Sequence, residues 1–93
     1  DYAALTRTPV ALHNVGSLVL CYANAHFGAS IQNFYRSESA LGRPTRHVEK
    51  MAASNPPEVK NSRLTVPMVP GLGFEPDMDH LKSQLLPNEP WWT

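Results

Sequence analysis

The stretches PVALH, residues 9–13, and IQNFYRSE, residues 31–38, decide the fold of this 93-residue chain. The first is a short apolar run that ends on a polar residue, which predicts a strand over Pro9–His13 buried on both faces. In the second, Phe34, Arg36 and Glu38 share one face of an extended segment. A second strand is therefore predicted over Ile31–Glu38.

The residues between these strands predict a helix. Turn and capping groups at residues 14–17 precede apolar side chains that recur at helical spacing, namely Leu18, Cys21, Tyr22, Ala25 and Ala29. We therefore expect a helix over Ser17–Ala29, and its many small residues would allow it to lie close to a sheet. Strand, helix and strand in this order predict a parallel βαβ unit and an α/β fold.

Glycines and prolines divide the chain into short pieces beyond Glu38. A brief helix is predicted around residues 47–53, and a hairpin with strands at 58–60 and 63–66 is predicted across Asn61 and Ser62. A Pro-Gly-Leu-Gly turn at residues 70–73 follows. Asp77 is then expected to cap a short helix, whose apolar face carries Met78, Leu81, Leu85 and Leu86 and which Pro87 ends.

Composition limits the size of the core and the class of partner. Nine prolines and few long apolar runs leave little apolar material, so we expect these 93 residues not to fold stably without further protein. Eight basic and eight acidic side chains cancel without forming blocks, so no nucleic-acid partner and no membrane partner is expected. No run reaches the ~18 apolar residues of a membrane span.

The single cysteine, Cys21, lies in an apolar stretch and has no second cysteine to pair with in this sequence. This usage fits a reducing compartment and predicts a cytoplasmic protein. We interpret Cys21 as a small buried apolar side chain rather than as a catalytic thiol.

His13 and Glu38 are placed by the two predicted strands at their carboxyl ends, where parallel α/β proteins carry functional sites. A histidine, with an ordinary pKa of about 6.5, can give or take a proton near neutral pH. From the residues alone two alternatives stay open. His13 could be a hydrogen-bonded residue at the end of a strand, and Glu38 a solvated carboxylate of a loop.

Several blocks of sequence resemble one enzyme family in their order and spacing. VALHN at residues 10–14, ANAH at 23–26 and NFYRSE at 33–38 are similar to the seventh strand, seventh helix and eighth strand of mandelate racemase and muconate lactonizing enzymes, a branch of the enolase superfamily. LTVP at 64–67 and PGLGFE at 70–75 resemble that family's C-terminal segment. The resemblance covers roughly residues 8–85, nearly the whole chain.

The resemblance implies that the chain is the C-terminal part of a (β/α)7β TIM-like barrel. Residues 1–43 would end the barrel domain, and residues 44–93 would return to pack on an N-terminal capping domain. It also implies a magnesium-dependent enzyme that abstracts the proton next to a carboxylate, in particular a sugar-acid dehydratase. A racemase or epimerase on the same scaffold is the alternative, and a non-catalytic protein-binding module is the rival from another class.

The resemblance also implies roles for three residues. His13 matches the histidine that acts as a catalytic acid or base at the end of the seventh strand. Glu38 matches a carboxylate close to the substrate, and a protonated or strongly hydrogen-bonded glutamate can stabilise developing negative charge. Asn14 is either a substrate-pocket residue or a turn residue.

Other parts of such an active site are expected outside these 93 residues. In the family, carboxylates from the third to fifth strands hold Mg2+, a lysine of the second strand is the opposite base, and an aspartate of the sixth strand orients the histidine. No metal ligand is therefore assigned here, and the piece alone is expected to be inactive. The implied partners are the remainder of the enzyme, an acid-sugar substrate and further copies of the subunit in a homo-oligomer.

The other histidines and the tryptophan pair receive structural interpretations. His26 lies in the middle of the predicted helix and is expected to be structural, whereas His47 and His80 are expected at the surface because neither has a partner at metal-ligand spacing. Trp91 and Trp92 predict either an anchoring tail or subunit contact, or a disordered end.

Overall fold

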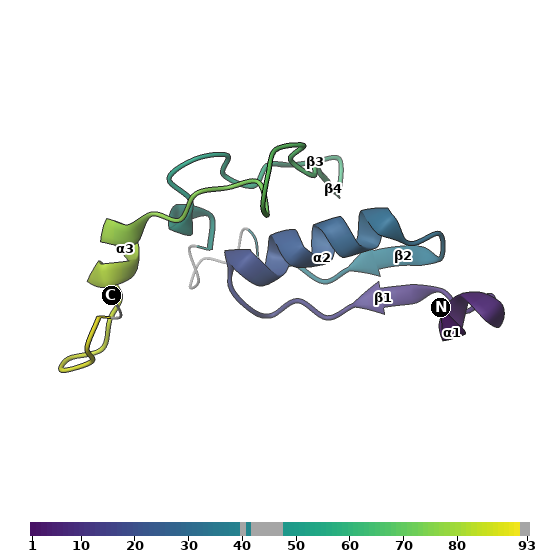
Figure 1. The fold of residues 1–93 in the computed structure, drawn as a ribbon, viewed down its shortest axis with the longest axis horizontal. Coiled ribbons are helices and arrows are strands. Elements are labelled where there is room, and N and C mark those ends of the chain that lie inside the picture. Colours follow the sequence, from purple (N-terminus) through teal and green to yellow (C-terminus); the bar gives the residue numbers. More distant parts are fainter. Residues whose placement is uncertain (40, 42–47, 92–93) are drawn as a thin grey trace.

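The computed structural model describes residues 1–39, 41 and 48–91, and Figure 1 shows their arrangement. A βαβ unit occupies the first half of the chain, and the second half returns over it as an extended segment with short elements. The molecule is elongated, with principal extents of 49 × 27 × 24 Å. A small core of described residues holds the two halves together.

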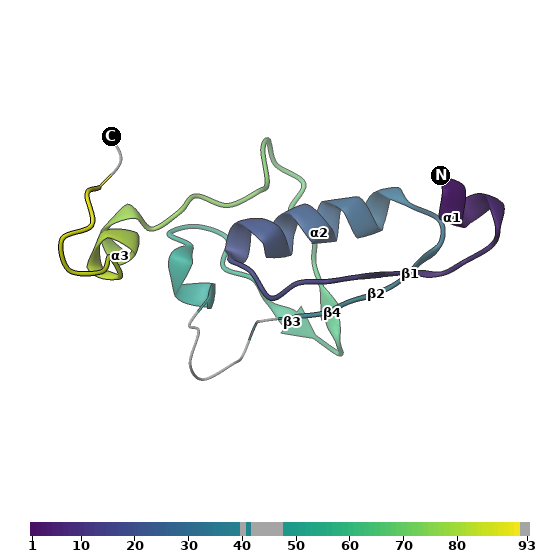
Figure 2. The ribbon, with the colours of Figure 1, turned by 90° about the horizontal axis from the view of Figure 1, so that it is seen from below.

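The βαβ unit consists of β1, Val10–Leu12, α2, Leu18–Ser30, and β2, Phe34–Ser37. β1 and β2 pair in parallel, as predicted, and α2 lies over them in Figures 1 and 2. Val10 pairs with Phe34 but Ala11 pairs with Arg36, so β2 contains one extra residue between these pairs.

Hydrogen bonds from the main chain extend this pairing at both ends. The Val10 N–H donates to the Asn33 carbonyl at 2.8 Å, and the Glu38 N–H donates to the Leu12 carbonyl at 2.8 Å. Both strands therefore remain aligned up to their carboxyl ends. This alignment brings His13 and Glu38 to the same edge of the sheet.

Helix α2 begins one residue after its N-cap, Ser17, and ends at Ser30, within one residue of the predicted bounds. Its buried residues include Leu18, Cys21 and Gly28. A Cβ on Gly28 would lie 2.9 Å from the Phe34 ring, so the missing side chain allows the close approach of helix and sheet that the small residues predicted.

Two expectations about burial are wrong. The prediction of a strand buried on both faces fails, because Ala11 is exposed and Val10 and Leu12 are only partly buried. The described sheet has two strands and α2 covers it from one side, which leaves the opposite side open. Ala29, expected on the buried side of the helix, is exposed.

The second half of the chain contains the predicted short elements, although the hairpin strands are shorter than predicted and the last helix ends at Ser83, before Leu85 and Pro87. They are a 3-10 helix η1 over Val48–Met51, an antiparallel hairpin of β3, Val59–Lys60, and β4, Arg63–Leu64, and a helix α3 over Met78–Ser83. Asn61 and Ser62 have φ values of 50° and 60°, the left-handed conformation that a two-residue hairpin turn requires. The element around residues 47–53 is shorter and more tightly wound than predicted, and His47 lies outside the described residues.

Local sequence explains why the start of α3 was predicted and why a further short helix was not. The Asp77 side chain accepts a hydrogen bond from the His80 N–H at 2.8 Å, which confirms its prediction as a helix cap. A one-turn helix α1 over Tyr2–Leu5 was not predicted, because four residues are too few to show helical periodicity.

The core joins α2 to the returning segment. Its buried apolar residues are Leu18, Cys21, Tyr22 and Val48. The Tyr22 ring stacks on Phe74 with centroids 5.1 Å apart, and its hydroxyl donates to the Asn55 carbonyl at 2.6 Å. These contacts hold the returning segment against the helix, and Figures 1 and 2 show the path of that segment beside α2.

Candidate functional site

His13 and Glu38 lie directly after β1 and β2 and face each other across the edge of the sheet. His13 Nε2 is 3.7 Å from Glu38 Oε2. The imidazole is 81% exposed and the carboxylate side chain 39% exposed, so solvent weakens the attraction between them and the pair contributes little to stability. An exposed imidazole beside a carboxylate remains available for proton transfer.

Asn14 is the buried member of the site, with only 2% of its surface exposed. Its backbone N–H donates to Glu38 Oε2 at 3.3 Å, so the strand-end loop holds the carboxylate close to His13. Its side-chain oxygen has no hydrogen-bond partner within the described residues. Asn14 lies in the loop after β1 and lines a cavity, and the substrate contact that the resemblance implies for it stays a prediction.

Cys21 lies beneath Asn14 and is also buried, as predicted. Burial raises the pKa of its thiol above the ordinary value of 9.0, and a hydrogen bond from the Asn14 side chain lowers it by a smaller amount. The thiol is therefore protonated at neutral pH and unsuited to act as a nucleophile.

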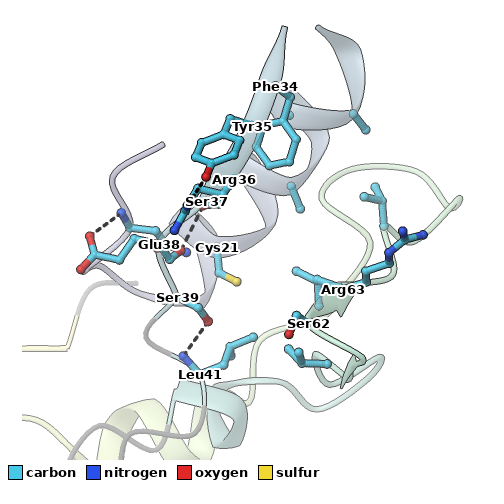
Figure 3. Close-up of a pocket in the computed structure, with 17 residues that line it drawn as sticks. Cys21, Phe34, Tyr35, Arg36, Ser37, Glu38, Ser39, Leu41, Ser62 and Arg63 are labelled. Carbon is cyan, nitrogen blue, oxygen red and sulfur yellow. Dashed lines mark hydrogen bonds between the residues drawn. The ribbon is translucent and has the colours of Figure 1, made fainter. Parts of the chain in front are cut away.

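A cavity of about 700 Å³ opens beside this edge of the sheet. Figure 3 shows that its walls come from α2, β2 and the hairpin, with Ser62 and Arg63 across from Cys21. Glu38 and Asn14 line it, whereas His13 is not among its lining residues. Glu38 therefore lies between the two, since its carboxylate is close to the His13 imidazole and its side chain also lines the cavity.

A sequence model of the family described as enolase C-terminal domain-like matches residues 1–80. The chain belongs to this family. Comparison with curated proteins and comparison with solved structures each gave no significant match. The family match indicates that this enolase-type chain is part of an enolase-superfamily enzyme, and the parallel βαβ unit agrees with the α/β fold expected for it.

Of the remaining histidines of the enolase-type chain, the structure describes His26 and His80, and neither lies at a strand end. The His26 ring is half-buried, and its Nε2 hydrogen-bonds the Leu72 carbonyl at 3.2 Å, which confirms a structural role in holding the returning segment on α2. His80 is partly buried rather than fully exposed, because it sits in the first turn of α3. His47 lies outside the described residues.

The C-terminal tryptophans are described only in part. Trp91 is partly buried, and the Lys82 ammonium lies 5.2 Å from the centroid of its ring. This cation–π contact ties the tail to α3. Trp92 lies outside the described residues, so the anchoring role predicted for the pair stays a prediction.

Magnesium ligands cannot be assembled from the described part of the enolase-type chain. Within residues 1–39, 41 and 48–91, no three His, Cys, Asp or Glu side chains are grouped so that they could hold a metal ion. The ligand set expected from the resemblance lies in other strands and stays a prediction. A separate finding is that, across these same ranges, none of the helices has the length and apolar character needed to cross a membrane.

Among the described residues, Asn24, Asn33 and Asn55 donate side-chain hydrogen bonds to backbone carbonyls, and none of these bonds was predicted from the sequence. Asn24, on α2, donates from Nδ2 to the His13 carbonyl at 2.8 Å, and Asn33 donates to the Thr8 carbonyl at 2.7 Å. For Asn24 the available signal was an amide side chain in a helix of mostly apolar residues, which identifies a polar contact but not its partner.

Proposed function

We propose that the chain forms the C-terminal part of a (β/α)7β barrel in a magnesium-dependent sugar-acid dehydratase. The observation that carries the proposal is the His13–Glu38 pair, 3.7 Å apart after two neighbouring parallel strands, in a chain of the enolase C-terminal domain-like family. Ligands commonly bind at the carboxyl ends of parallel strands, so this edge is the part of the chain best placed to meet a substrate.

His13 is the general acid in this proposal. A base outside these residues removes the proton next to the substrate carboxylate, and His13 gives a proton from its imidazolium to the departing β-hydroxyl, which leaves as water. The enol that remains tautomerises to a keto acid, so the overall reaction is the loss of one water molecule. The high exposure of the imidazole, 81%, supports a group placed to exchange protons rather than to stabilise the fold.

Glu38 is proposed to contact the substrate beside His13. The Asn14 N–H donates to Glu38 Oε2, so a main-chain hydrogen bond holds the carboxylate at the strand end. A carboxyl group held in this way can bind a substrate hydroxyl or, when protonated, stabilise negative charge that develops on the substrate.

The wider organisation is also a proposal. Residues 1–43 end the barrel, residues 44–93 pack on an N-terminal capping domain, and the magnesium ligands belong to strands outside this chain. The contacts of Tyr22 with Phe74 and Asn55 support a returning segment that is held on α2. Assembly with the remainder of the enzyme, a homo-oligomeric state and a cytoplasmic location complete the proposal.

The test uses the intact enzyme with Mg2+ and a set of acid sugars that differ in the configuration of their hydroxyl groups. Proton NMR in D2O would follow the α-proton and the appearance of a keto acid that has lost one water. Dehydration of at least one acid sugar is expected. Exchange or inversion at the α-carbon without loss of water would identify a racemase or epimerase instead, and no α-proton exchange with any acid would contradict the enzyme proposal.

A further inference from the structure

One peptide unit joins His13 to its neighbour Glu38. The carbonyl of His13 and the N–H of Asn14 belong to the same planar amide, and the two groups point in opposite directions because the peptide is trans. The carbonyl accepts from Asn24 Nδ2 at 2.8 Å, and the N–H donates to Glu38 Oε2 at 3.3 Å. The peptide is therefore held from both sides, by a side chain of α2 and by the carboxylate after β2.

We propose that Asn24 is a positioning residue, which holds this peptide so that Glu38 stays opposite the imidazole of His13. The inference rests on the proposed function, because it assigns Asn24 a part in the same proton-transfer site. Its physical basis is that donation to the carbonyl oxygen polarises the amide and strengthens the N–H as a donor to the carboxylate. Without Asn24, this peptide could rotate and release Glu38.

Fixed groups on either side of this peptide show why it needs support of its own. The Leu12 carbonyl accepts from the Glu38 N–H and is part of the sheet, and the Asn14 side chain is buried beside Cys21. The His13 carbonyl lies between these fixed points but beyond the end of β1. The hydrogen bond from Asn24 of α2 to this carbonyl therefore fixes the direction in which the chain continues after β1.

A matched control exists at the opposite end of the same strand. Asn33 donates from Nδ2 to the Thr8 carbonyl at 2.7 Å, so it makes the same kind of bond, to a residue that precedes β1. Both bonds are exposed to solvent. Loss of either should have a similar effect on stability, but only Asn24 is connected to the His13–Glu38 pair.

The experiment compares Asn24→Ala with Asn33→Ala in the intact enzyme, by turnover of an accepted acid sugar. Asn24→Ala should lower kcat roughly ten- to hundredfold with little change in KM, because small misplacements of reacting groups are costly. Asn33→Ala should leave kcat within about twofold of the parental value. Asn24→Asp, which keeps the side-chain size and removes the N–H donors, is the second variant and should also lower kcat.

A double-mutant cycle gives a readout that does not depend on activity. Asn24→Ala and Glu38→Ala are combined, and the unfolding equilibrium is measured by urea titration of the intact protein. Because both residues bind one peptide, their effects should be coupled by roughly threefold or more in the unfolding constant, whereas Asn33→Ala and Glu38→Ala should be additive. The gain in helix propensity at Asn24 is the same in both backgrounds and cancels.

Three results would overturn the inference and can be told apart. Additive effects of Asn24→Ala and Glu38→Ala on unfolding would show that the peptide does not connect them. Coupled unfolding with an unchanged kcat for Asn24→Ala would show a purely structural bond. If His13→Asn also kept the parental rate, the proposed function itself would have failed, and the positioning role would be lost with it.

Discussion

Gly73 carries the turn that seats the returning segment on α2, and its replacement gives a prediction of defined size. Its φ is +92°, and a Cβ built on it would lie 2.4 Å from Pro67 Cβ. The Gly73 carbonyl accepts from Asn55 Nδ2 at 2.9 Å, and the preceding Leu72 carbonyl binds His26. Gly73→Ala therefore disturbs a turn whose two consecutive carbonyls are both hydrogen-bonded to side chains of other segments.

Two costs add at this position. A non-glycine residue in a left-handed or rarer conformation costs about 1–2 kcal/mol. Overlap with the proline ring adds roughly 1–3 kcal/mol, because the ring is rigid and cannot rotate away from the new methyl group. Gly71 is the control: its φ is +75°, but a Cβ there meets nothing within 4 Å. Gly71→Ala should therefore cost only the first of the two.

The assay is urea or thermal unfolding of the intact protein carrying each substitution. Both alanines restrict the unfolded chain by the same amount, so that effect cancels in the comparison. Gly73→Ala should lose about 1–3 kcal/mol more than Gly71→Ala. Equal losses, or a larger loss at Gly71, would refute the packing of Gly73 against Pro67.

Three further predictions concern the core. Tyr22→Phe keeps the stack on Phe74 but removes the hydroxyl donation to Asn55, so unfolding of the intact protein should show a loss of about 0.5–1.5 kcal/mol, and an unchanged midpoint would contradict this bond. Burial raises the pKa of both Cys21 and Tyr22, so the folded state keeps protons that the unfolded state releases. The contribution of these two groups to the free energy of unfolding should therefore be fully present below pH 9.0, the ordinary thiol value, and should fall as the pH rises above it. Cys21→Ala should weaken this pH dependence. A free energy of unfolding that rises with pH in this range would exclude it. The isolated 93 residues should show no cooperative thermal transition by circular dichroism, since the described part of the chain buries four apolar residues in its core, and a sharp melt would contradict this.

The elements that the sequence predicted well are those whose signals are local. The hairpin follows from Asn61 and Ser62, which accept the left-handed turn, and the α3 cap follows from Asp77, whose carboxylate reaches an N–H three residues later. The βαβ order was readable because β1 and α2 each have a clear apolar pattern.

Contacts between distant segments could not be predicted in the same way. The Tyr22 hydroxyl binds a carbonyl 33 residues away, and His26 binds one 46 residues away. No periodicity in the sequence encodes which carbonyl will be nearby, because the path of the returning segment decides it. The exposed faces of β1 were likewise mispredicted, since the neighbours that a buried strand requires are not part of the described sheet.

The site was predictable in outline but not in its supporting bonds. The proximity of His13 and Glu38 follows from parallel strands that end together, and the structure places their side chains 3.7 Å apart. The donation from the Asn14 N–H to Glu38 and the Asn24 bond depend on the loop dihedrals after β1. These were not readable from residue types alone, because turn residues such as asparagine suit many conformations.

Turnover by His13→Asn in the intact enzyme tests the central claim most directly. Asparagine keeps a hydrogen-bonding side chain of similar size but cannot supply a titratable proton near neutral pH. His26→Asn is the control, because His26 is bound to the Leu72 carbonyl and should affect stability rather than chemistry. Loss of the general acid in His13→Asn should lower kcat by about 10²- to 10⁴-fold with an almost unchanged melting temperature. A His13→Asn enzyme that turns over its acid substrate at nearly the parental rate would show that His13 is not the general acid.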